Sequence, residues 1–322
     1  ETKDENIMNQ VLIIRKQFAQ ELGLLLGPIR IRDNLQLGMN EYAIKIKGNT
    51  QAKGNLYMDK ELMLLPDGQD VTFKGIPAKE PAFGLDALWI ESSDREMAEI
   101  NDFTVVDPLT VLVTHLKETI RLNSYSLLGR QEVKQLLEGL KDKYNVVIDE
   151  LIPDVLRLGE VQKVLQNLLK EQIPITDMVT ILETLADYGN TVKDTELLTE
   201  YVRQALKYTI VQPYMDESQT LNVVTVHPDT EELLSRNIQK SSAGSIPVLQ
   251  GDVITKLFDS VKVVHYQLET QGIPHVLLVS PKIRPAMKNL IHYNFPELAV
   301  LSLNEVPNEI AITAAGMVDS IA

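Results

Sequence analysis

The sequence predicts a mixed α/β and α+β chain built from several subdomains, with a helical segment between two α/β segments. Three observations predict this class. Apolar residues alternate at the strand period near the start, recur at the helix period in the middle, and follow alternating strand and helix patterns toward the end. At 322 residues, the chain also exceeds the length at which a single core usually stops growing. We therefore expect several cores.

The first α/β subdomain is predicted to be discontinuous, formed by residues 1–66 and 108–127. Apolar residues recur at steps of three and four from residue 4 to residue 22, which indicates an amphipathic helix. Alternation in IRIRDN, EYAIKIKG and GNLYMDKELMLL then predicts strands. In FTVVDPLTVLVTHLKETI the pattern switches from strand to helix, with Asp107 as N-cap and Pro108 at the first helical position.

Three further segments follow from changes of pattern. Residues 67–107 are rich in Gly, Pro and turn residues after a turn signal at residues 66–68, which predicts a small inserted β-rich lobe. Residues 128–207 carry one apolar helical stripe after another, which predicts an all-helical subdomain. Residues 208–322 alternate strands such as LNVVTV, HVLLVS and LAVLSL with helices and one Ser/Gly loop, which predicts a small C-terminal α/β subdomain.

Charge and composition exclude several classes of function. The net charge of -14 and the pI near 4.9 disfavour nucleic acid and anionic membrane surfaces as partners. The absence of cysteine excludes a disulfide framework and a cysteine nucleophile, and it fits the cytoplasm. No apolar stretch approaches the ~20 residues of a spanning helix. Because ETKDEN has neither a starting Met nor signal-peptide features, we expect a fragment of a longer protein.

The common catalytic and cofactor motifs are missing from the sequence. It has no Walker loop, no G-x-G-x-x-G after a strand, no G-x-S-x-G and no H-E-x-x-H, and its histidines form no local metal pair. We expect no cofactor and no metal. One alternative stays open, because Arg284 in LLVSPKIRP stands near a helix N-terminus where an anion can bind. A nucleotide- or phosphate-binding enzyme could use this anion site, although the favoured interpretation is that Arg284 covers a helix end or pairs with a local carboxylate.

The stretch EPAFGLDALWIE, residues 80–91, contains the only tryptophan of the chain. Its composition favours a turn followed by a short strand, with Trp89 packed inward. The alternative is that Pro81 and Gly84 hold a bend that props Phe83 outward beside an acid, which is typical of a protein-binding anchor.

Long motifs occur in order along residues 13–307. They are IRKQFAQELG, IRIRDNLQL, EPAFGLDALWIE, FTVVDPLTVLVTHL, SLLGRQEVKQLLEGL, VLQNLLKEQIPITDMVTILETLADYG and LLVSPKIRPAMKNLIHYNFPELAVLSLNEVP. Together they resemble the cytoplasmic domain of the flagellar export-gate (FHIPEP) family, which has injectisome counterparts in virulence-type type III secretion.

The resemblance implies the soluble part of a membrane protein at the cytoplasmic face of the bacterial inner membrane, and not an enzyme. Such domains form a nonameric ring below the export gate and dock export chaperones that carry substrates toward the channel. Implied partners also include the gate switch protein and the export ATPase complex. FGLDALWIE favours the flagellar system, and the injectisome system stays open as the alternative.

The resemblance also implies a chaperone site, in a hydrophobic dimple between the first two subdomains. The acid-Pro-x-Phe motif of the family falls on Glu80, Pro81 and Phe83, and a Thr that precedes His-Leu falls on Thr114 in VTHL. The acid is often Asp in relatives. We expect Phe83 to fill an apolar slot on the chaperone, while Glu80 and Thr114 set the orientation by hydrogen bonds at its edge.

Overall fold

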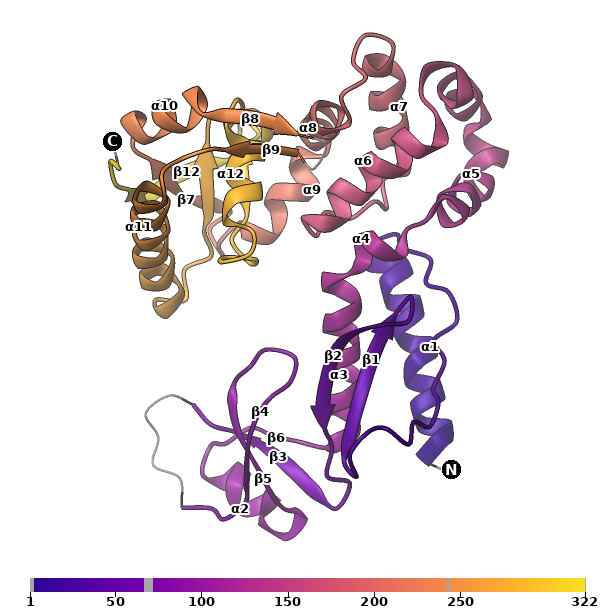
Figure 1. The fold of residues 1–322 in the computed structure, drawn as a ribbon, viewed down its shortest axis with the longest axis vertical. Helices are drawn as coiled ribbons and strands as arrows, with labels where there is room; N and C mark the ends of the chain where they lie inside the picture. Colours follow the sequence, from indigo (N-terminus) through magenta and orange to yellow (C-terminus); the bar gives the residue numbers. More distant parts are fainter. Residues whose placement is uncertain (1–2, 67–71, 242–243, 322) are drawn as a thin grey trace. The chain divides into compact units, whose positions relative to one another are not determined.

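The computed structural model describes residues 3–66, 72–241 and 244–321. It divides into two compact units, residues 1–136 and residues 137–322, each with secondary structure of its own (Figure 1). Each unit also has hydrophobic core residues of its own. The predicted turn at residues 66–68 lies mostly outside the described residues.

The first unit begins with α1 (Lys3–Glu21), which packs against α3 (Pro108–Leu122). The predicted apolar stripe of α1 is its buried face, which includes Val11, Ile14 and Phe18. Asp107 caps α3 as predicted, since its carboxylate accepts a hydrogen bond of 3.0 Å from the backbone N–H of Thr110. The helix therefore starts where its sequence signals place it.

A hairpin of β1 (Glu41–Ile46) and β2 (Asn49–Asn55) lies beside these helices in the first unit (Figure 1). Its two connecting residues both have positive φ, as a tight two-residue hairpin requires. The strand predicted at IRIRDN, residues 29–34, is not formed. No strand within the described ranges pairs with this segment, and Ile31 is 60% exposed. The alternating residues there therefore have neither a neighbouring strand nor a buried face.

An antiparallel sheet in the order β4-β5-β3-β6 completes the first unit. Its strands and small helices are β3 (Lys60–Leu64), β4 (Ile76–Lys79), β5 (Asp86–Glu91), η1 (Ser92–Asp94), α2 (Arg95–Ile100) and β6 (Val105–Val106). Although β3 follows the hairpin in sequence, it pairs with β5 and β6 and thus belongs to this sheet. Trp89 is 2% exposed and packs edge-on against Tyr57, so it points inward as its composition favoured.

The second unit starts with helices, as predicted. After α4 (Ser124–Leu127) at the end of the first unit, they are α5 (Arg130–Glu150), which spans the division, η2 (Leu151–Val155), α6 (Leu158–Lys170), α7 (Met178–Gly189), α8 (Thr195–Ala205), α9 (Lys207–Val211) and η3 (Gln212–Tyr214). The apolar stripe of α6 is fully buried, which accounts for the strong helical periodicity of this segment.

The chain ends in an α/β region around a parallel sheet in the order β11-β10-β7-β12. Its elements are β7 (Thr220–Val226), α10 (Pro228–Arg236), β8 (Ile238–Ser241), β9 (Gly244–Pro247), α11 (Gly251–Thr270), β10 (Val276–Val279), α12 (Arg284–Ile291), β11 (Val300–Ser302), η4 (Leu303–Glu305) and β12 (Ala311–Val318). The three predicted strands form its centre and one edge. The other edge, β12, was not predicted, and β8 and β9 form a ribbon where the Ser/Gly loop was expected.

The predicted fold class is therefore confirmed: a mixed chain with α/β parts on both sides of a helical part. The boundaries chosen for the subdomains stay a prediction. No helix within the described ranges is long and apolar enough to cross a membrane.

Candidate functional site

The turn between β4 and β5 in the first unit carries three of the four residues predicted for the site. Glu80 is 6% exposed, and its carboxylate accepts hydrogen bonds from two backbone N–H groups of its own turn. Oε1 accepts from Ala82 at 2.9 Å and Oε2 accepts from Phe83 at 2.7 Å. Charge-assisted bonds of this kind are stronger than neutral ones, so Glu80 acts as a brace inside the turn.

The braced turn presents an apolar tip. Phe83 is 63% exposed and Leu85 is 50% exposed, while Pro81 is half-buried. Two backbone hydrogen bonds of 2.8 Å, from Gly84 N–H to the Glu80 carbonyl and from Glu80 N–H to the Leu85 carbonyl, close the loop. Gly84 has a φ of +74°, a conformation that costs other residues about 1 kcal/mol or more. The turn thus has a fixed backbone and exposes the aromatic ring of Phe83 to solvent.

Two residues that the sequence did not single out lie behind Glu80. Tyr42 on β1 and His115 on α3 share a hydrogen bond of 2.6 Å between the phenol oxygen and Nδ1. Burial, together with the Glu80 carboxylate, raises the pKa of Tyr42. Burial lowers the pKa of His115, and Glu80 offsets part of that effect. The alternation in EYAIKIKG already placed Tyr42 on the inner face, but nothing local indicated its partner.

Tyr42 also needs space on the neighbouring strand. Its ring lies over Gly54 of β2, where an added Cβ would come within 2.5 Å of the phenol oxygen. Gly54 is therefore the residue that lets the Tyr42–His115 pair close beneath the turn.

Thr114, the fourth predicted residue, lies on α3 directly before His115 and is half-buried. Within the described part of the chain its hydroxyl makes no hydrogen bond, and no bond links it to Glu80 or Phe83. The first unit thus brings Glu80 close to the helix that carries Thr114, while the Thr114 hydroxyl has no partner inside the unit.

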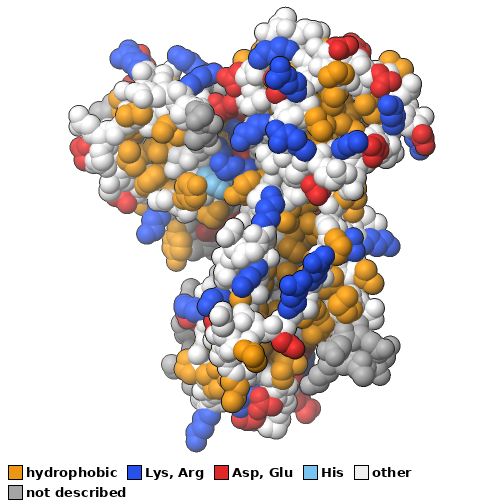
Figure 2. All heavy atoms as spheres, turned by 45° about the vertical axis from the view of Figure 1, so that its right-hand side comes forward, with side chains coloured by type: hydrophobic (Ala, Val, Ile, Leu, Met, Phe, Trp, Pro, Cys, Tyr) orange, Lys and Arg blue, Asp and Glu red, His pale blue; other side chains and the backbone are white. Residues whose placement is uncertain are grey.

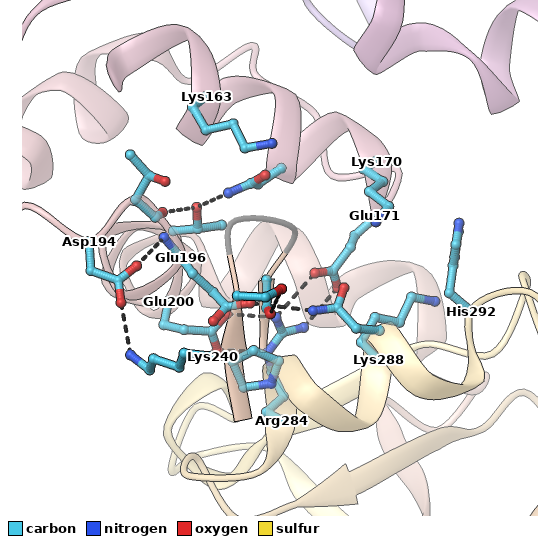
Figure 3. Close-up of a pocket in the computed structure, with 17 residues that line it drawn as sticks. Lys163, Lys170, Glu171, Asp194, Glu196, Glu200, Lys240, Arg284, Lys288 and His292 are labelled. Atoms are coloured by element: carbon cyan, nitrogen blue, oxygen red, sulfur yellow. Dashed lines mark hydrogen bonds and ion pairs between the residues drawn. The ribbon is translucent and has the colours of Figure 1, made fainter. Parts of the chain in front are cut away.

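The second unit contains a cluster of buried charges that is unrelated to the predicted site (Figure 3). Arg203 and Arg284 are each 2% exposed. Arg284 binds Glu200 through two hydrogen bonds of 2.6 Å and Glu171 through bonds of 2.8 Å and 3.1 Å. Arg203 binds Glu171 at 2.9 Å and Glu305 at 2.6 Å. Each guanidinium is therefore shared between two carboxylates.

The cluster decides the role of Arg284. Burial alone would raise the pKa of Glu171, but Arg203 and Arg284 outweigh it and hold that pKa at about 2. Arg284 pairs with carboxylates, but they are not the local ones expected from the sequence, since Glu200 and Glu171 stand 84 and 113 residues away. It presents no free guanidinium to a phosphate. The nucleotide-binding alternative thereby loses its anchoring residue. Within the described ranges, no group of three or more His, Asp or Glu side chains is arranged to hold a metal ion.

Comparison with known proteins identifies a family. The FHIPEP family model matches residues 1–311. Flagellar biosynthesis protein FlhA of Bacillus subtilis (strain 168) is 41% identical over 314 residues, which cover 98% of this chain and 46% of that protein. The protein of the same name from Salmonella typhimurium is 37% identical over 300 residues, which cover 93% of this chain and 43% of that protein. The chain thus spans less than half the length of these relatives.

Solved structures of other proteins share this fold. The Chlamydia pneumoniae CdsV protein has a TM-score of 0.83 and 27% identity, covering 97% of this chain and 90% of that one. A nonameric EPEC SctV-C assembly has a TM-score of 0.76 and 25% identity, covering 99% of this chain and 95% of that one. The structure of a CdsV and CdsO complex has a TM-score of 0.80 and 26% identity, covering 99% of this chain and 93% of that one. Both the sequence and the fold lead to the same conclusion: this chain belongs to the FHIPEP family.

Proposed function

We propose that this chain is a cytoplasmic docking platform of the flagellar type III protein export gate, which binds export chaperones with their substrates and passes the substrates toward the membrane channel. Membership of the FHIPEP family supports a part in export. The name of the relatives, flagellar biosynthesis protein, favours the flagellar system over an injectisome.

The observation that carries the docking proposal is the braced turn with its exposed ring. Phe83 is 63% exposed although it is a large apolar side chain, and the two hydrogen bonds to the Glu80 carboxylate fix the backbone beneath it. A rigid aromatic anchor loses little entropy on binding and commonly dominates an interface. We place Phe83 in an apolar slot of the chaperone, with Leu85 extending the contact.

The other two site residues then have different roles. Because both oxygens of Glu80 are occupied within the turn, Glu80 positions Phe83 rather than reaching the partner itself. The Thr114 hydroxyl, which makes no hydrogen bond in the described part of the unit, donates to or accepts from the chaperone at the edge of the contact. Pro81 sets φ at the start of the bend.

A ring of copies at the cytoplasmic face of the inner membrane is part of the same proposal. Two structural neighbours, EPEC SctV-C and the EscV cytosolic domain, are described as nonameric. A third neighbour forms a complex with CdsO. By analogy, the export ATPase complex and the gate switch protein are further partners of the full-length protein.

Titration calorimetry with a flagellar chaperone–substrate complex tests the proposal. Phe83→Ala is expected to weaken binding by about 2 kcal/mol, roughly thirtyfold. Tyr266→Ala is the matched control: Tyr266 on α11 is 64% exposed, so this substitution removes an equally exposed ring at another place. The Tyr266→Ala variant should bind the chaperone with the affinity of the parent chain.

Two results would count against the proposal. If Phe83→Ala and Tyr266→Ala bind the chaperone with the same affinity, the turn is not the docking site. If an injectisome chaperone binds the parent chain and flagellar chaperones do not, the docking function stands but its assignment to the flagellar system is wrong.

A further inference from the structure

The second unit contains a pocket of about 290 Å³ between α6, α8, the β8–β9 ribbon and α12 (Figure 3). Its lining is mostly polar and includes five basic and four acidic side chains, an excess of one positive charge in a chain of net charge -14. The basic residues are Lys163, Lys170, Lys240, Arg284 and Lys288, and the acidic ones are Glu171, Asp194, Glu196 and Glu200. A basic pocket in an acidic protein requires an explanation.

The acidic side chains of the pocket all have partners. Glu171 and Glu200 bind Arg284, and Asp194 binds Lys240 at 2.8 Å. Glu196 accepts hydrogen bonds from the backbone and side chain of Ser245. These four acidic side chains are therefore already bound to partners within the unit. Not all basic side chains of the lining have such a partner.

Lys288 is the most unusual of them, because it is 7% exposed and has no carboxylate within ion-pair distance in the described part of the chain. Among the described residues, its Nζ donates to two backbone carbonyls, at 2.9 Å to Leu298 and 3.4 Å to Pro296. Burial lowers the pKa of Lys288, and Glu171 only partly offsets this effect. Buried ammonium groups are normally paired with an anion.

Lys170 and His292 lie on the same side of the pocket as Lys288 (Figure 3). Burial lowers the pKa of His292, the positive charges of Lys288 and Lys170 lower it further, and Glu171 offsets part of this effect. The Nδ1 atom of His292 is buried without a hydrogen-bond partner in the described part of the chain. Lys170 and Lys163 make no ion pair there either. Basic side chains also gather on the visible face of the second unit (Figure 2).

We propose that this pocket binds a carboxylate group, presented by an acidic segment of a partner protein and held between Lys170 and Lys288 beside His292. A single carboxylate cancels the one excess positive charge of the lining, whereas a phosphate, with about two negative charges at neutral pH, would leave the pocket with a net negative charge. The proposal rests on the second unit alone and is independent of docking at Phe83.

The probe for the test is a capped peptide of three Glu residues, with the capped Gln peptide and inorganic phosphate as comparison ligands, titrated into the whole chain. The Glu peptide is expected to bind more tightly than either comparison ligand. It should also raise the pKa of His292, followed by NMR of the imidazole ring, because a nearby anion favours the protonated ring. Binding should therefore strengthen as the pH falls through the His292 pKa.

Two variants complete the experiment. Lys170→Gln is expected to lower the affinity about tenfold, as loss of one charge-assisted hydrogen bond does, while Lys262→Gln, an exposed lysine on α11, should have no effect. Circular dichroism checks that both variants fold. The proposal is overturned if the Glu peptide does not bind, if the Gln peptide or phosphate binds as tightly, or if the two lysine variants behave alike.

Discussion

Each unit holds a carboxylate that is largely shielded from solvent, and the hydrogen-bond donors of the two carboxylates differ in origin. Glu80 in the first unit takes its hydrogen bonds from backbone groups two and three residues further along the chain. Glu171 in the second unit takes its bonds from Arg203 and Arg284, which stand 32 and 113 residues away. A buried carboxylate is thus stabilised either by a local turn or by groups that only the folding of a whole region brings together.

The two solutions have different consequences. A carboxylate held by its own turn orders a short loop and leaves the rest of the surface free, which suits the display of a docking residue such as Phe83. Charges that meet across long stretches of chain tie the helical part of the second unit to its α/β part, since Arg203 on α8 reaches Glu305 in η4 and Arg284 on α12 reaches Glu200 on α8. Removing a member of the second arrangement should therefore cost far more stability.

The largest effect is expected from Arg284→Met. The change leaves Glu200 buried without a cation and Glu171 with Arg203 alone, which costs about 3–5 kcal/mol of unfolding free energy. Urea unfolding followed by circular dichroism measures it. Arg236→Met is the control, because Arg236 is 73% exposed and its pair with Glu232 on the surface should contribute less than about 1 kcal/mol. Equal losses of unfolding free energy in Arg284→Met and Arg236→Met would contradict a larger contribution from the buried cluster than from the surface pair.

The pH dependence of the second unit should reveal the same cluster. The pKa of Glu171 lies at about 2 in the folded chain, against an ordinary 4.5, so its stabilisation is complete above about pH 4.5 and is lost as the pH falls toward 2. Burial raises the pKa of Glu200, which gives that residue a contribution of opposite sign. Thermal unfolding from about pH 5 downward should thus depend less on pH in Glu171→Gln than in the parent. If the unfolding temperature of Glu171→Gln changed with pH as steeply as that of the parent, the lowered pKa would not belong to Glu171.

A smaller loss is expected from Glu80→Gln in the first unit. The amide offers one acceptor oxygen where the carboxylate offers two, so one backbone N–H of the turn loses its partner at a cost of about 1–3 kcal/mol. Fluorescence of Trp89, the only tryptophan, reports unfolding of this unit. The exposed Glu91→Gln serves as control and should change stability by less than about 1 kcal/mol. Chaperone affinity should fall in Glu80→Gln because Phe83 is held less firmly.

The smallest effect is expected from Thr114→Ala. Since the Thr114 hydroxyl makes no hydrogen bond in the described part of the chain, stability should stay within about 0.5 kcal/mol of the parent. Chaperone affinity should nevertheless drop about fivefold, as expected for the loss of one neutral hydrogen bond. Thr114→Ser, which keeps the hydroxyl, should restore most of the affinity. Full affinity in Thr114→Ala would remove this residue from the site.

Much of the fold could be read from local patterns. The stripe of α1, the Asp107 cap and the inward Trp89 were predicted because burial periodicity, capping and turn chemistry act over a few residues. The same patterns wrongly predicted a strand at residues 29–34, where no neighbouring strand is available in the described structure. They also missed β12, whose partner β7 lies about ninety residues earlier in the sequence. A strand forms only where a second strand can pair with it, and that second strand can be distant in sequence.

The class of the fold, the cap of α3 and the bend at Pro81 and Gly84 follow from local sequence patterns, since each pattern involves residues within a few positions of one another. The carboxylates that pair with Arg284, and the burial of Lys288 beside Lys170 and His292, became apparent only in the folded chain. The physical reason is that ion pairs depend on distance and burial in the folded chain, and neither is encoded in the local period of a helix or strand.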